Sequence, residues 1–191
     1  MKEEIKSLET AGSDGFVIGC LRRDSNGLLK VCQRDATSLV NSSQKPFTFH
    51  RAFDVSMGPI EDELKAISIS GCSYLLTSGR ASIGKDKGLA FVMGSIKNIY
   101  NSENKTQISP IIENICQLST QCRKLNIKLM IGGGVTEQNA KSILDLGVDF
   151  IHGSFSTKTI FQNAIFHLGT VHQSQADTIA RVVSICKNDN N

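Results

Sequence analysis

Histidine, arginine and aspartate lie within one short segment, at His50, Arg51 and Asp54. Histidine titrates near neutral pH, arginine binds anions through a fork of N–H donors, and aspartate can orient either of them. If the strand that carries them is regular to its end, His50 and Asp54 leave one face and Arg51 the other. The segment could transfer a proton or bind an anion, or it could form an internal salt bridge beside a core histidine.

Polar and glycine residues also follow three other apolar runs. They are Thr77, Ser78 and Gly79; Gly132, Gly133 and Gly134, followed by Thr136; and His152 and Ser154. Glycines at such positions let backbone N–H groups approach a phosphate, although tight strand-to-helix turns require glycine without any ligand. Motifs for a phosphate-binding loop, a nucleophile elbow or a zinc protease are absent, so no reaction can be assigned from the sequence.

Five apolar runs predict the strands that must position these side chains. They cover residues 15–21, 47–54, 74–79, 128–134 and 150–154. Between and around them, apolar periodicity predicts helices over about 1–11, 28–41, 59–70, 88–99, 110–125, 136–146 and 175–187. This alternation predicts parallel βα units, in a TIM (β/α)8-type barrel or in an open doubly wound sheet. Five strands are too few to close a barrel of eight.

The bulk composition limits the class of protein. With 40% apolar and 20% charged residues, the 191-residue chain is typical of one globular domain, which we assign to residues 1–191. The net charge of +3 is spread along the chain and tryptophan is absent, so we expect no nucleic-acid partner. Neither a secretory signal nor a long apolar run appears, which predicts no membrane span and a cytoplasmic, or nuclear, location.

Six cysteines stand at positions 20, 32, 72, 116, 122 and 186. None has the spacing of a zinc site, and we interpret them as reduced, mostly buried thiols. Nothing in the spacing shows two of the thiols converging. Cys116 and Cys122, six residues apart on a predicted helix, should point in different directions.

Taken in order, the runs 14–21, 48–54, 75–79, 132–136 and 151–154 resemble the copper homeostasis protein family CutC. The string Thr-Phe-His-Arg-Ala-Phe-Asp at 48–54 is highly specific, and the resemblance extends from about residue 4 to residue 154. It implies a (β/α)8-type barrel, a cytosolic protein and a link to copper, as Cu(I), but no reaction. Family members carry residues that match a set of strand-end positions here: His50, Arg51, Asp54, Thr77, Ser78, Gly132, Gly133, Gly134 and His152.

The chain departs from the family in two ways. It lacks the three opening βα units, which hold the cysteines proposed to bind copper in animal relatives, and residues 90–108 resemble an insertion. A barrel without three strands would expose two sheet edges. We expect a shortened isoform or an incomplete gene model, and keep open a homo-oligomer that covers its edges.

Three functional interpretations follow. The first is copper homeostasis with Cu(I) binding. The second is an enzyme that takes a small anionic or phosphorylated substrate at the strand ends, with His50 or His152 as acid or base and Arg51 as anion clamp. The third is a chain without activity of its own that acts by associating with a full-length partner.

Overall fold

The computed structural model describes residues 1–80, 110–160 and 170–188. The helix predicted at 88–99 and the insertion predicted at 90–108 lie outside these residues. The described helices are α1 (Lys2–Thr10), α2 (Gln33–Val40), α3 (Ala52–Val55), α4 (Ile60–Ile69), α6 (Pro110–Lys124), α7 (Glu137–Leu144) and α8 (Ala176–Asn188).

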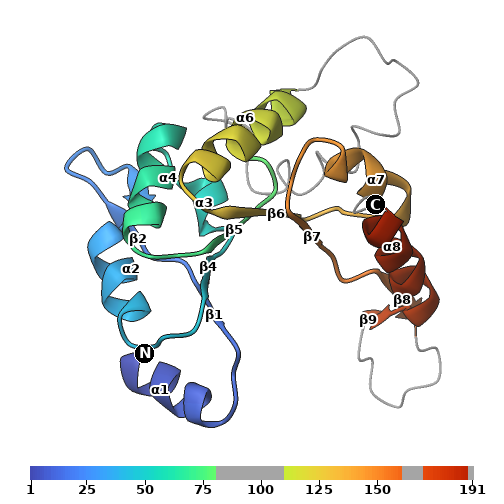
Figure 1. Cartoon of the computed structure of the whole chain (residues 1–191), viewed down its shortest axis with the longest axis horizontal. Coiled ribbons are helices and arrows are strands. Elements are labelled where there is room, and N and C mark those ends of the chain that lie inside the picture. Colours follow the sequence, from blue (N-terminus) through green and yellow to red (C-terminus); the bar gives the residue numbers. More distant parts are fainter. Residues whose placement is uncertain (81–109, 161–169, 189–191) are drawn as a thin grey trace.

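A five-stranded parallel sheet forms the centre of the described part of the chain, in the order β1-β4-β5-β6-β7. Its strands are β1 (Phe16–Ile18), β4 (Phe47–Phe49), β5 (Tyr74–Thr77), β6 (Lys128–Gly132) and β7 (Phe150–His152). They lie side by side across the molecule in sequence order, each joined to the next through a helical connection where the chain is described (Figure 1). This is the arrangement of consecutive βα units, and it confirms the predicted incomplete (β/α)8-type barrel with about five units.

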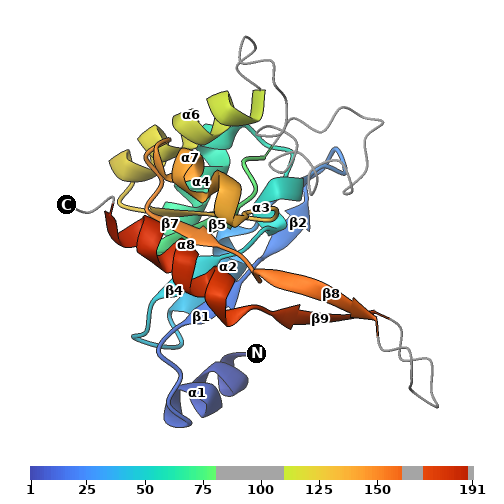
Figure 2. The same ribbon diagram turned by 90° about the vertical axis from the view of Figure 1, so that its right-hand side faces the viewer.

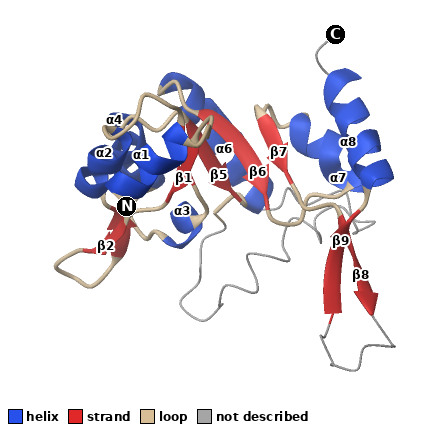
Figure 3. Cartoon of the chain, turned by 90° about the horizontal axis from the view of Figure 1, so that it is seen from below, coloured by secondary structure: helices blue, strands red, loops and turns tan. Residues whose placement is uncertain are grey.

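The two faces of the sheet differ in exposure. Phe49, Leu75 and Ile131 point to one face, are fully buried and belong to the same apolar core as residues of α4, α6 and α7. In the view from below, α6 lies behind β5 and β6, and α7 lies to the right of β7 (Figure 3). On the opposite face, Val17 of β1 is 64% exposed and Phe150 of β7 is 44% exposed. The core therefore lies between the sheet and the helices.

Two antiparallel hairpins were not predicted. The first pairs β2 (Leu21–Arg23) with β3 (Leu29–Val31), where the sequence predicted a helix from residue 28. Asp24 closes its turn by accepting the N–H groups of Asn26 and Leu28 at 2.9 and 3.0 Å. This turn reverses the chain, so the apolar run that follows it pairs with β2 as a strand. The helix starts only at Gln33.

The second hairpin joins β8 (Ser156–Ile160) to β9 (Thr170–Ser174) and leads into α8. It extends away from the parallel sheet, and α8 returns to pack beside α7 (Figure 2). The sequence predicted the final helix but no strands between it and β7.

The face assignment predicts unequal effects for two neighbouring residues of β1. Ile18→Ala removes a side chain that is only 5% exposed, so we expect unfolding to become easier by about 2–5 kcal/mol. Val17→Ala, at the exposed neighbour, should change stability by less than about 0.5 kcal/mol. Urea unfolding followed by circular dichroism measures both. Equal losses in the two variants would contradict the assignment of the faces.

Candidate functional site

The carboxyl ends of β4, β5 and β6 bring part of the predicted site together. Arg51 and Asp54 follow β4, Thr77 and Ser78 end β5, and Gly133 follows β6. Since these strands are adjacent and parallel, their carboxyl ends meet at one edge of the sheet. The five residues form a single cluster, which we call the strand-end network.

Asp54 is the centre of the strand-end network. Its side chain is 3% exposed and accepts hydrogen bonds from Arg51 Nε at 2.8 Å and from Ser78 Oγ at 2.9 Å. The Ser78 N–H, at 3.1 and 3.2 Å from the two carboxylate oxygens, and the Thr77 hydroxyl also donate to it. A buried carboxylate requires such partners, and here the protein itself supplies them.

The predicted directions of these side chains were wrong. Residues 47–54 do not form one strand, because β4 ends at Phe49 and residues 52–55 form the short helix α3. The turn places Arg51 and Asp54 three residues apart on one helical face, where they pair, instead of on opposite faces of a strand. The predicted alternative of an internal salt bridge matches this geometry.

The glycine triplet serves the local backbone. Gly133 and Gly134 have φ values of +92° and +110°, which favour glycine. A Cβ atom on Gly133 would lie 2.8 Å from Arg51 Nη1, so the absent side chain makes room for the guanidinium. Gly134 accepts a hydrogen bond from the amide of Asn139, whose oxygen binds the Thr136 N–H at 2.7 Å and caps α7.

His50 lies at the end of β4 but turns away from Asp54. Its ring packs against Gly19, where a Cβ atom would lie 1.9 Å from the imidazole Cε1. The Nδ1 atom accepts the Ala52 N–H at 2.9 Å, which places the proton of the neutral ring on Nε2. His50 is therefore positioned to donate a hydrogen bond and not to accept a proton at Nδ1.

The remaining predicted residues do not join the strand-end network. His152 is exposed on β7, three strand spacings or about 14 Å along the sheet from the end of β4. Ser154 lies two residues beyond β7, exposed, with its hydroxyl 3.0 Å from that of Ser156. Gly79 uses its N–H to bind the Thr77 hydroxyl at 3.1 Å.

Two buried charged residues beside the network were not singled out in the sequence. Arg80 is 8% exposed, donates to the carbonyls of Ser56 and Gly58 at 2.5 and 2.6 Å, and stacks over the Phe53 ring. Burial lowers the pKa of its guanidinium, and the charges of Glu63 and Asp54 oppose that shift. Nothing in the residue type of Arg80 indicated from the sequence that its side chain would be buried.

Glu63 is the second of these residues and is 3% exposed. It accepts the N–H groups of Gly58 at 3.1 Å and of Val31 at 2.6 Å. Arg80 and Glu63 thus hold the loop between α3 and α4 from two sides. Position gave a signal for Glu63, since it lies beside the apolar stripe of α4.

The cysteines differ in their exposure to solvent. Cys32, Cys72 and Cys122 are buried, Cys20 and Cys186 are partly buried, and Cys116 is exposed. Burial, with a smaller contribution from Asp149, raises the pKa of the Cys122 thiol to about 12. The opposite exposures of Cys116 and Cys122 agree with their predicted divergence. In the described residues, no group of three or more histidine, cysteine or acidic side chains could hold a metal ion.

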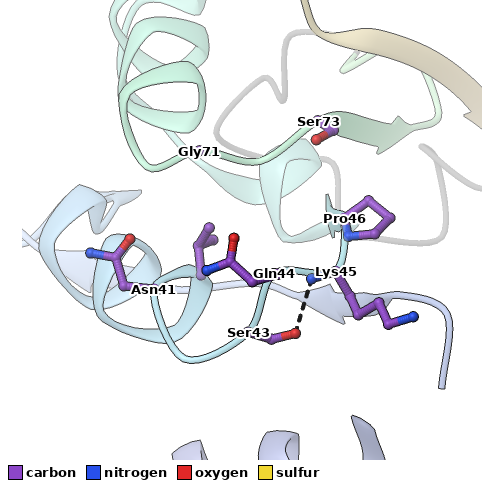
Figure 4. Close-up of a pocket in the computed structure, with 8 residues that line it drawn as sticks. Asn41, Ser43, Gln44, Lys45, Pro46, Gly71 and Ser73 are labelled. Atoms are coloured by element: carbon purple, nitrogen blue, oxygen red, sulfur yellow. Dashed lines mark hydrogen bonds between the residues drawn. The ribbon is translucent and has the colours of Figure 1, made fainter. Parts of the chain in front are cut away.

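A shallow pocket lies at the opposite end of the strands. It is lined by residues 40–41, 43–46, 71 and 73, which precede β4 and β5 (Figure 4). Within this lining, the Lys45 N–H donates a hydrogen bond to the Ser43 hydroxyl at 3.0 Å. Lys45 is the one charged side chain of its lining, so this pocket offers no chemistry that would replace the strand-end network as a candidate.

The resemblance to the CutC family is confirmed by comparison with known proteins. Residues 1–90 match the sequence model of the CutC family. A CutC family protein of Vibrio cholerae serotype O1 is 31% identical over 159 residues, covering 82% of this chain and 52% of the relative. The human copper homeostasis protein cutC homolog is 28% identical over 145 residues, covering 76% and 42% of the two chains. The chain spans about half the length of the curated relatives it matches.

Among solved structures, native KDPGal superposes on 98% of this chain and 65% of its own, with a TM-score of 0.54 and 14% identity. This likeness supports the incomplete barrel and speaks only to the fold. None of the helices in the described residues is long and apolar enough to span a membrane.

The buried position of Asp54 predicts a large effect of its substitution. Asp54→Asn removes the charge opposite Arg51 and turns an amide N–H2 toward hydroxyl and N–H donors, so we expect a loss of about 3–5 kcal/mol in the free energy of unfolding. The matched control is Asp145→Asn, since Asp145 and its partner Lys141 are both more than half exposed. That control should change stability by less than about 1 kcal/mol. Chemical denaturation measures both, and a mild effect at Asp54 would show that the network does not hold the strand ends.

Proposed function

We propose that this chain, a relative of the CutC family, takes part in copper homeostasis by binding Cu(I) through cysteine thiols in the cytoplasm. The observation that supports the proposal is the family match, together with the name of the human relative as a copper homeostasis protein. Residues 1–191 would act as one domain, and association of two copies over the edge strands β1 and β7 is part of the same proposal.

The thiols have the chemistry that Cu(I) requires. Cysteine sulfur is a soft ligand, and soft ligands favour Cu(I) over the hard cations that prefer oxygen. Cys20, Cys32, Cys72, Cys116 and Cys122 are not in disulfides, so none of these five has to be reduced before it can bind. The strand-end network offers no such ligand, because Asp54 is already occupied by its own donors.

Cu(I) binding should therefore depend on the thiols. We expect the reduced chain, titrated with Cu(I) without oxygen against the chelator bicinchoninate, to retain at least one ion per chain. Alkylation of the unfolded chain with iodoacetamide should abolish retention, since the ligand sulfurs are then blocked. A chain that removes no Cu(I) from the chelator, or that retains as much after alkylation, would contradict the proposal.

A second function is favoured by one contact of Arg51. Its guanidinium lies at the carboxyl ends of the strands against Gly133, where the backbone leaves it room. Its side chain stays 26% exposed, while Nε donates to Asp54 and Nη2 donates to Ser78 Oγ at 3.2 Å. The second candidate is thus an enzyme acting on a small anionic or phosphorylated substrate at this end of the sheet.

Phosphate binding distinguishes the second candidate from the first. Inorganic phosphate should bind at least about tenfold more weakly to Arg51→Gln, because a charge-assisted hydrogen bond contributes roughly 1.5–3 kcal/mol. Arg181→Gln, which removes an exposed arginine paired with Glu137, should bind phosphate as the unsubstituted chain does. Isothermal titration, with circular dichroism to check folding, measures the affinities. Equal affinities in both variants would exclude an anion site at Arg51.

A further inference from the structure

Two cysteines lie directly opposite each other at the base of the β2–β3 hairpin. The antiparallel register pairs Leu21 with Val31, and the Cys32 N–H donates to the Cys20 carbonyl at 2.8 Å. The pairing therefore continues by one residue, to Cys20 and Cys32. Residues directly opposite in an antiparallel pair point to the same face, so the two thiols share one side of the hairpin.

The spacing of this pair allows both thiols to bind one bridging ion. The hydrogen bond between Cys32 and Cys20 marks a hydrogen-bonded pair, in which the Cα atoms are about 5.5 Å apart and the Cβ atoms about 4.5–5.5 Å. A disulfide draws its Cβ atoms to about 3.8 Å. Two metal–thiolate bonds of about 2.3 Å each instead allow the sulfurs to stay as far as about 4.6 Å apart.

Both cysteines of the pair are at least partly shielded from solvent. Cys32 is 9% exposed, and Cys20 is partly buried against the apolar core. The Cys32 thiol is hydrogen-bonded to the Asp35 carboxylate.

Neighbouring side chains fix the hairpin. Glu63 accepts the N–H of Val31, next to Cys32, at 2.6 Å, and the Met57 N–H donates to the Leu29 carbonyl at 2.7 Å. These contacts hold β3 in place before any ligand arrives. Arg22, two residues after Cys20, pairs with Asp35 at 3.2 Å and so links β2 to the first turn of α2.

We propose that Cys20 and Cys32 together bind one Cu(I) ion as a two-coordinate dithiolate. Each thiol loses its proton and forms one sulfur–copper bond, so two protons are released and no electron is transferred. The inference rests on the proposed function, to which it adds the location of the ion. A two-coordinate site also agrees with the lack of any three-ligand group among the described residues.

Single substitutions test the site against a matched control. Cys20→Ser and Cys32→Ser each remove one of two ligands, so we expect Cu(I) affinity, measured against bicinchoninate without oxygen, to fall at least a hundredfold. Cys116→Ser removes an exposed thiol outside the pair and should bind Cu(I) as the unsubstituted chain does. Circular dichroism melting of every variant checks the fold, since Cys32 is buried.

A second measurement needs no variant. With one equivalent of Cu(I) bound, Cys20 and Cys32 should be protected from iodoacetamide in peptide mapping, and X-ray absorption should show two sulfur ligands. Protection of other cysteines, or three sulfurs around the copper, would overturn the inference.

The outcomes separate the two proposals. If the unsubstituted chain binds no Cu(I), the proposed function fails and the inference fails with it. If that chain binds Cu(I) and the Cys20 and Cys32 variants bind it equally well, only the inference fails.

Discussion

The arrangement of the strand ends depends on the ion pair and the hydrogen bonds that the buried Asp54 carboxylate forms. It gathers donors from the turn after β4 and from the end of β5. A buried charge is tolerated only when it is paired and hydrogen-bonded, so the chain must turn into α3 at this point to bring Arg51 within reach. Gly133, without a side chain, then leaves the space that the guanidinium occupies.

The side chains at the strand ends bind groups of their own chain, which limits their capacity to bind a ligand. Asp54 is engaged by its donors, and His50 uses Nδ1 to bind its own chain at Ala52. Cys20 and Cys32 differ, because sulfur forms only weak hydrogen bonds, such as the one between the Cys32 thiol and the Asp35 carboxylate. This difference is the reason why the proposed Cu(I) site lies in the hairpin and not at the strand ends.

The sequence predicted the sheet well and the site in part. Apolar runs mark these parallel strands because one face of the sheet lies in the apolar core, and all five predicted strands are present. The predicted strands extend too far at their carboxyl ends. For β4 the reason is that Phe53 is as apolar as Phe49, although Phe53 belongs to the helix α3. The hairpin was missed because Leu28, Leu29 and Val31 fit a helical as well as an extended pattern. The pairing of Cys20 with Cys32 depends on that hairpin, so no spacing rule could have found it.

The strand-end network and the thiol pair are joined by a continuous chain of contacts. Arg80 holds the loop at Ser56 and Gly58, Gly58 donates to Glu63, and Glu63 accepts the N–H of Val31 beside Cys32. A two-stranded hairpin alone is marginally stable, so β3 depends on this buried anchor for its position. Leu21 and Val31 of the hairpin also pack against the apolar core, so this packing and the buried charged groups together fix the position of the hairpin. The hydrogen bonds of Glu63 thus order the backbone from the loop after α3 to β3.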